Sequence, residues 1–109
     1  MQVQNMTVED YENLLNSNEI VLVDFWAEWC GPCGQMHQVV EDVAKEIKDE
    51  TDLDIEFYKV NVEEEPDLAQ HFSVLSLPTF ILFRNGNVKH AWSGSSTKEL
   101  FKDIILDHA

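Results

Sequence analysis

The order of three segments between residues 20 and 62 constrains the fold most. "IVLVDFW" (20–26) is a nearly continuous run of β-branched and aromatic residues, typical of a strand covered on both faces. "IEFYKVNV" (55–62) alternates apolar and polar residues, as a half-buried strand does. Between them, apolar residues recur at the spacing of an amphipathic helix: Met36, Val39, Val40, Val43, Ala44 and Ile47. Strand, helix and strand in this order predict a parallel, right-handed crossover.

Three further helices are predicted from capping signals. Thr7 has N-cap spacing to Asp10, and the apolar face that follows consists of Tyr11, Leu14 and Leu15. A short helix is predicted from Pro66, which suits a first helical position, to about His71. Ser96 has capping-box spacing to Glu99, and the next apolar face consists of Leu100, Phe101, Ile104 and Ile105.

A hairpin completes the predicted sheet. "TFILF" and "VKHAW" flank Asn85-Gly86, the dipeptide that a tight type I′ turn requires. Together the segments predict an α/β fold, with a mixed central sheet and helices on both sides. No repeat or linker divides the 109 residues, so we expect a single domain over residues 1–109.

The charge and the start of the chain limit the partners. A formal net charge of −14 argues against binding to nucleic acid or to anionic membranes, because both are polyanions. We interpret this charge mainly as a source of solubility, with attraction of basic partner surfaces as the alternative. The opening "MQVQNMTVED" has no signal-peptide pattern, and the apolar stretches are too short to span a bilayer. We therefore expect a cytoplasmic protein.

The two cysteines, Cys30 and Cys33, enclose Gly31 and Pro32. As a structural staple, a disulfide closing so small a loop would contribute only about 2 kcal/mol. A structural zinc takes four nitrogen or sulfur ligands, of which this motif supplies two, so we expect no metal. The four histidines lack ligand spacing: His37, His71, His90 and His108. Redox chemistry is therefore the favoured interpretation of the cysteine pair.

The helical pattern assigns different roles to the two thiols. Extended backwards, it puts Cys33 on the buried stripe and Cys30 at the start of the helix. Unpaired N–H groups and the helix dipole stabilise a thiolate at such a terminus. We therefore expect Cys30 to be an exposed nucleophile and Cys33 a shielded resolving thiol. Pro32 suits the first turn, where its missing N–H is not needed.

The segment "VDFWAEWCGPC" closely resembles the active-site segment of the thioredoxin family, and the likeness extends through "FYKVNVEEEP", "LSLPTF" and "FRNGNV". The resemblance covers nearly the whole chain. It implies a five-stranded mixed sheet flanked by four helices. It also implies reduction of disulfide-containing protein substrates through a redox-active Cys30–Cys33 disulfide, without a cofactor, and re-reduction by a thioredoxin reductase. We expect the protein to be a monomer.

The resemblance also implies roles for two charged residues. Asp24 interrupts an apolar strand, where an unpaired charge is costly. We favour a buried acid with a raised pKa that takes the proton from Cys33, over a carboxylate hydrogen-bonded at a strand edge. Lys59 would face Asp24 from the next strand as a tuning charge. The alternative for Lys59 is a lysine whose ammonium extends to the surface.

The expected substrate contacts lie on both sides of the cysteines. Trp26 is interpreted as partly core, whereas Trp29 is expected to form an exposed apolar wall for incoming polypeptide. In the family, the bond that matches Leu77–Pro78 is cis and faces the cysteines. This arrangement leaves the backbone of Leu77 free to pair with a bound peptide. A proline that simply starts a strand is the alternative for Pro78.

Three departures from the family pattern bear on redox potential and partner choice. Gly34 stands where many members carry lysine or arginine, and Gln38 where a proline often kinks the helix. "KDETDLD" lengthens the second helix or its exit loop. Two alternatives to a disulfide reductase stay open. One is a more oxidising relative such as a disulfide isomerase, and the other is a thioredoxin-fold binding subunit that engages its partner regardless of redox state.

Overall fold

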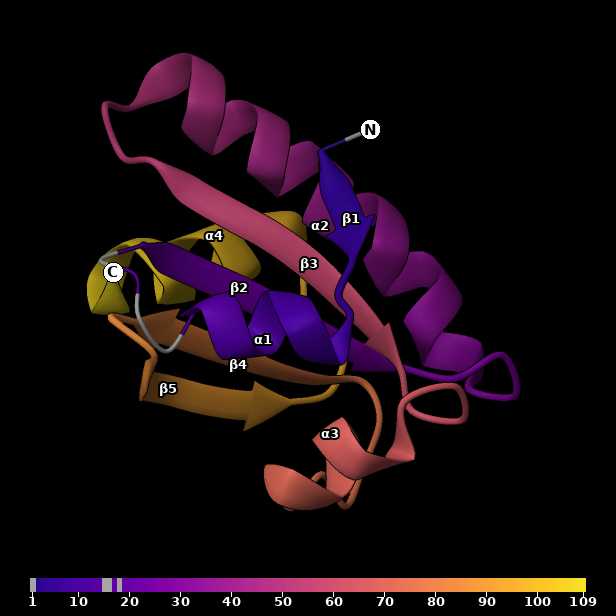
Figure 1. Ribbon diagram of the computed structural model, residues 1–109. Helices are drawn as coiled ribbons and strands as arrows, with labels where there is room; N and C mark the ends of the chain where they lie inside the picture. Colours follow the sequence, from indigo (N-terminus) through magenta and orange to yellow (C-terminus); the bar gives the residue numbers. More distant parts are fainter. Residues whose placement is uncertain (1, 15–16, 18) are drawn as a thin grey trace.

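A mixed sheet is the centre of the computed structural model, which describes residues 2–14, 17 and 19–109. Its strand order is β1-β3-β2-β4-β5 (Figure 1). The strands are β1 (Val3–Asn5), β2 (Ile20–Trp26), β3 (Ile55–Asn61), β4 (Thr79–Arg84) and β5 (Asn87–Ser93). β1, β3 and β2 are parallel to one another, whereas β4 is antiparallel to both β2 and β5. The predicted mixed sheet and the parallel pairing of β2 with β3 are confirmed.

Helices cover both faces of this sheet (Figure 1). One face carries α1 (Val8–Leu14) and α3 (Pro66–His71), and the other carries α2 (Gly31–Glu50) and α4 (Lys98–His108). α2 and α4 are neighbours, since Lys98 and Lys102 of α4 both form ion pairs with Glu46 of α2. None of the helices in the described residues combines the length and the apolar character needed to cross a membrane.

The alternation of side chains along β2 divides the core into two layers. Val21, Val23 and Phe25 pack beneath α1 and α3, whereas Leu22 packs with the buried residues of α2 and α4. Successive strand residues point to opposite faces, so Asp24 and Trp26 lie on the same face as Leu22. The sheet therefore presents Asp24 to the helix that begins at the cysteines.

Helix α2 matches the predicted amphipathic pattern. Its buried residues are Cys33, Met36, Val40, Val43, Ala44 and Ile47, and Val39 packs against the same cluster. The helix begins at Gly31, with Cys30 as its N-cap. It continues to Glu50, so part of "KDETDLD" extends the helix itself.

The terminal helices confirm one capping prediction and correct another. Asp10 donates its backbone N–H to the Thr7 hydroxyl at 3.1 Å, as predicted for α1. Leu15 lies outside the described residues. The prediction of Ser96 as the cap of the last helix is wrong by one residue: the side chain of Thr97 accepts the Leu100 N–H at 3.2 Å.

The face predicted for this last helix is also corrected. Phe101 and Ile105 are buried, and Ile104 is half-buried, but Leu100 is exposed. Leu100 immediately precedes Phe101, so the two side chains diverge by about 100° around the helix axis. With Phe101 directed into the core, Leu100 points to solvent.

The hairpin turn forms where the sequence predicts it. Asn85 and Gly86 connect β4 to β5 with φ angles of 56° and 77°. Positive φ at both central residues is the requirement of a type I′ turn, which Asn-Gly meets at low cost.

Candidate active site

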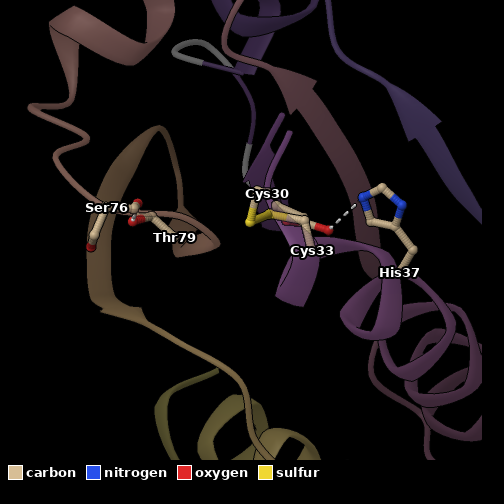
Figure 2. Close-up of a disulfide and its surroundings, with 6 residues drawn as sticks. Cys30, Cys33, His37, Ser76 and Thr79 are labelled. Atoms are coloured by element: carbon tan, nitrogen blue, oxygen red, sulfur yellow. Dashed lines mark hydrogen bonds and ion pairs between the residues drawn. A yellow bond between two sulfur atoms is a disulfide. The ribbon is translucent and has the colours of Figure 1, made fainter. Parts of the chain in front are cut away.

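Cys30 and Cys33 form a disulfide at the start of α2. Their Cα atoms are 5.4 Å apart, within the usual range for a disulfide. Figure 2 shows the bond with the His37 ring on one side and the segment of Ser76 and Thr79 on the other. The segment before β4 therefore faces the disulfide, as expected from the resemblance.

The two cysteines differ in exposure. Cys33 is 1% exposed, as the helical pattern predicts, and Cys30 is 8% exposed. Cys30 is thus the more accessible of the two residues, but in the disulfide form it is buried and not exposed as expected. Its sulfur is bonded to that of the buried Cys33.

Helix geometry favours a thiolate at Cys30 when the disulfide is reduced. Cys30 is the N-cap of α2, and its side chain makes no capping hydrogen bond. No acidic residue lies in the first turn of the helix. The positive end of the helix dipole therefore acts on the sulfur without a carboxylate in that turn to offset it. Gly31 and Pro32 form the exposed start of the helix.

Asp24 is a buried acid beneath this helix, with 1% of its surface exposed. Burial raises the pKa of its carboxyl from the ordinary 3.8 to about 7, although the Lys59 cation partly opposes the shift. The strand-edge alternative is wrong, because β2 pairs with β3 on one side and β4 on the other. A group that titrates near neutral pH can accept and release a proton during turnover.

Lys59 lies beside Asp24, at the paired position of β3. It is half-buried, and its ammonium lies 5.9 Å from the centre of the Trp26 ring. The structure therefore brings together Asp24 and Lys59, as expected for a tuning charge. Trp26 is half-buried, in agreement with a partly core position.

His37 belongs to the site, although the sequence prediction treated it as one of four scattered histidines. Its Nε2 lies 3.7 Å from Oδ2 of Asp24, and its ring meets the Trp26 ring edge-on at 4.8 Å. The available signal was helical spacing, because residue 37 lies one turn after Cys33 on the same side of α2. Its partner was hidden, since Asp24 approaches from a different element.

An apolar groove lies on the other side of the cysteines. Trp29 is 71% exposed and lines a pocket of about 190 Å³ together with Val74, Leu75 and Leu77. The Leu77–Pro78 peptide bond is cis, as the resemblance implies, and Pro78 is buried. Trp29 and Leu77, predicted separately, thus border one groove.

The sequence matches the family model described as Thioredoxin over residues 2–107. A thioredoxin of Rickettsia prowazekii is 36% identical over 104 residues, which cover 94% of this chain and 95% of the relative. The chain belongs to the thioredoxin family. It is a thiol–disulfide oxidoreductase that acts by dithiol–disulfide exchange through the Cys30–Cys33 pair.

Two further thioredoxins extend the comparison. The crystal structure of Malassezia sympodialis thioredoxin has a TM-score of 0.84 and 28% identity, with 99% of this chain and 90% of that chain covered. The bifunctional thioredoxin reductase/thioredoxin of Mycobacterium leprae is 38% identical over 95 residues. Those residues are 86% of this chain and 20% of the Mycobacterium protein.

The departures from the thioredoxin pattern lie around the disulfide and on the adjoining surface of α2. Gly34 is exposed, and a Cβ added there would meet nothing within 4 Å. The position could therefore hold the cation that many thioredoxins carry. Gln38 donates to Asp42 at 2.8 Å within the helix.

Among the described residues, no group of three or more potential ligands is placed to hold a metal ion.

Proposed function

We propose that this thioredoxin is a general reductase of protein disulfides, with Cys30 as nucleophile and Cys33 as resolving thiol. The observation that carries the proposal is the disulfide at the N-terminus of α2, in which the more accessible residue is the N-cap, Cys30. In the reduced protein, the Cys30 thiolate attacks one sulfur of a substrate disulfide. The substrate bond breaks, a mixed disulfide forms, and the other substrate sulfur leaves as a thiolate and takes up a proton.

Asp24 acts in the second step. As the Cys33 thiol approaches Sγ of Cys30, its proton passes to the ionised Asp24 carboxylate. The Cys33 thiolate then displaces the second substrate sulfur and forms the Cys30–Cys33 bond. Two electrons thus pass from the dithiol to the substrate. A carboxyl pKa of about 7 suits this role, because the group is partly ionised at neutral pH.

The substrate polypeptide lies in the groove bordered by Trp29 and Leu77. Exposed Trp29 and Leu75 supply apolar contact, and the backbone of Leu77 pairs with the extended substrate. The protein thus offers an apolar surface and one backbone pairing site. The backbone of the substrate can pair whatever its sequence. The substrates are therefore recognised as exposed disulfides in accessible segments and not as one defined sequence.

The oxidised protein is returned to the dithiol by a thioredoxin reductase. The Mycobacterium relative, named as a reductase joined to a thioredoxin, supports this pairing. We place the protein in the cytoplasm as a single-domain monomer without a cofactor. A reducing compartment keeps such a pair available as a dithiol, and the net charge of −14 opposes association with anionic membranes and nucleic acid.

A redox titration against glutathione tests the proposed direction of catalysis. A reduction potential near −270 mV, typical of thioredoxins, is expected for a reductase. A potential near −180 mV, typical of protein disulfide isomerases, would favour the more oxidising alternative. The binding-subunit alternative is tested separately: a Cys30→Ser/Cys33→Ser double variant that keeps the cellular role would contradict the proposal.

The role of Asp24 is tested by single-turnover kinetics of Asp24→Asn. The mixed disulfide should form at the wild-type rate and decay more slowly, because the proton acceptor for Cys33 is absent. Acid-quenched samples analysed by mass spectrometry report both steps. Decay at the wild-type rate would contradict the role assigned to Asp24.

A further inference from the structure

The imidazole of His37, on helix α2, faces the carboxyl of Asp24, on strand β2. His37 lies on α2, one helical turn after Cys33, and its Nε2 is 3.7 Å from Oδ2 of Asp24 on β2. The Trp26 ring meets the imidazole edge-on, at 4.8 Å and an interplanar angle of 86°. The imidazole therefore contacts both an aromatic ring and a buried acid. Figure 2 shows the His37 ring beside the disulfide.

Both groups have unused hydrogen-bonding capacity. Among the residues that the structure describes, neither Nε2 of His37 nor Oδ1 of Asp24 has a hydrogen-bond partner within the protein. Buried polar atoms are rarely left in this condition without a functional reason or a bridging water. A small movement, or one water molecule, would connect the ring nitrogen to the carboxyl oxygen.

His37 connects the buried acid to the surface. Asp24 is 1% exposed, whereas the His37 side chain is 29% exposed. His37 lines a pocket of about 220 Å³ together with Asp24, Gly34 and Lys59. It also lines a second pocket, of about 360 Å³, that contains Cys30 and Gly34. The imidazole thus borders both the pocket of the acid and the pocket of the nucleophile.

Charged groups reach the His37–Asp24 pair from β3, from α2 and from the segment between β2 and α2, where Glu28 lines the pocket that His37 shares with Cys30. Lys59 faces the pair from β3, and Asp24 itself lies on β2. Glu41 lines the pocket from α2, and its carboxylate accepts the backbone N–H groups of Gln2 and Val3. Its acceptor oxygens are thus engaged by β1 and the residue before it. The other polar pocket residue from α2, Gln38, does not titrate.

The electrostatics reverse the ordinary order of the two proton affinities. Burial, and then the Lys59 cation, lower the pKa of His37 from its ordinary 6.5. Burial raises the pKa of Asp24 to about 7. The carboxyl therefore holds a proton more strongly than the imidazole does. Transfer from Asp24 to His37 is uphill, and loss of the proton from the imidazolium to water is favoured at neutral pH, which gives the transfer a direction out of the site.

We propose that His37 carries the proton that Asp24 receives from Cys33 out to solvent. Nε2 takes the proton from the Asp24 carboxyl, which becomes a carboxylate again. The imidazolium then loses a proton from Nδ1 to water, and the ring returns to its neutral form in the other tautomer. His37 acts through Asp24, so it is a positioning residue for the resolving step. The inference rests on the proposed role of Asp24 as proton acceptor.

Single-turnover decay of the mixed disulfide tests the proposal, with His37→Gln and His37→Ala as variants. Near pH 7 part of the Asp24 population is protonated and must lose its proton before it can accept that of Cys33. Both variants should therefore slow decay there by about tenfold, less than the 10²–10⁴ of direct general acid–base catalysis, because water can still enter the pocket. Formation of the mixed disulfide, measured in a Cys33→Ser background, should not change. Gln38→Ala, which alters a neighbouring pocket residue without removing a titrating group, is the matched control and should decay at the wild-type rate.

Chemical rescue separates proton transfer from a structural effect. Added imidazole should restore decay in His37→Ala in a concentration-dependent manner, and it should have no effect on His37→Ala/Asp24→Asn. Wild-type decay in both His37 variants, or a loss that imidazole does not restore, would overturn the proposal. Slow decay in Asp24→Asn with normal decay in both His37 variants would refute the role of His37 alone. Wild-type decay in Asp24→Asn would refute the role of Asp24 and, with it, the relay.

Discussion

Asp24 and Lys59 occupy paired positions on the adjacent parallel strands β2 and β3, on the sheet face that α2 covers. Burial and the Lys59 cation act on the pKa of Asp24 in opposite directions, and burial has the larger effect. Burial raises the pKa of the Asp24 carboxyl to about 7 even with the lysine cation beside it, so desolvation outweighs the attraction between the two groups. Lys59 therefore moderates the acid without holding it fully ionised at neutral pH.

Replacing Lys59 with Met should raise the pKa of two groups at once. The Asp24 pKa should increase above about 7, because the cation that favours its carboxylate is gone. The His37 pKa should also increase, because the same cation disfavours the imidazolium. NMR titration of the Asp24 carboxyl carbon and the His37 ring in the oxidised protein measures both values. Unchanged titrations would show that the ammonium is screened from the pair.

The buried acid should make stability depend on pH. The folded-state pKa of Asp24 lies above its unfolded value, so its stabilising contribution is fully present below about pH 3.8 and is lost as pH rises through about 7. A pKa raised from 3.8 to about 7 corresponds to about 4 kcal/mol. Urea unfolding of oxidised Asp24→Asn should therefore show a gain over wild type of up to this size at pH 8.5.

The same comparison at low pH provides the control. At pH 4 the wild-type carboxyl is already neutral in the folded protein, so Asp24→Asn should differ little from wild type. A gain of equal size at both pH values would point to packing and not to ionisation.

The cap of α4 should depend on Thr97. Thr97→Ala should lower the free energy of unfolding by about 1 kcal/mol, since the Leu100 N–H loses its acceptor. Ser96→Ala is the matched control and should change stability little, because the Ser96 hydroxyl has no partner among the described residues. Chemical unfolding of both variants compares them directly. A larger loss for Ser96→Ala would restore the cap predicted from the sequence.

The net charge of −14 should affect the rate at which basic substrates are reduced. Raising the salt concentration from about 0.01 M to about 0.15 M shortens the Debye length from about 30 Å to about 8 Å, so attraction over longer distances is lost. The second-order rate for a basic disulfide-bonded protein should fall, and the rate for an acidic one should rise. Flat profiles for both would leave the charge as a determinant of solubility only.

Local signals in the sequence predicted most of the fold. The apolar run of β2, the amphipathic stripe of α2 and the Asn85-Gly86 turn each depend on residues close together in the chain, and each formed where predicted. The cap of α4 was misplaced because Ser96 and Thr97 are adjacent and chemically equivalent as caps. The helix begins at Lys98, so Thr97 occupies the N-cap position and its hydroxyl accepts the Leu100 N–H.

Part of the site was also predicted from local signals in the sequence. Cys30 and Cys33 form a motif, and Asp24 stands out as a charge within an apolar strand. His37 is marked only by its spacing of one helical turn from Cys33, which is a weak signal, since a histidine on a helix is usually a surface residue. Its place in the site follows from the sheet face that Asp24 occupies and the turn of α2 that lies above it, a relationship between elements that periodicity alone does not give.

The roles of Cys30 and Cys33 are tested most directly by mass spectrometry of Cys33→Ser and Cys30→Ser after each reduced variant meets a disulfide-bonded protein. Cys33→Ser should accumulate a mixed disulfide through Cys30 that added dithiol releases. Cys30→Ser should trap little, because its remaining thiol belongs to a residue that is 1% exposed and lies on the buried side of the first turn of α2. Equal trapping by the two variants, or faster trapping through Cys33, would contradict the proposed division of roles.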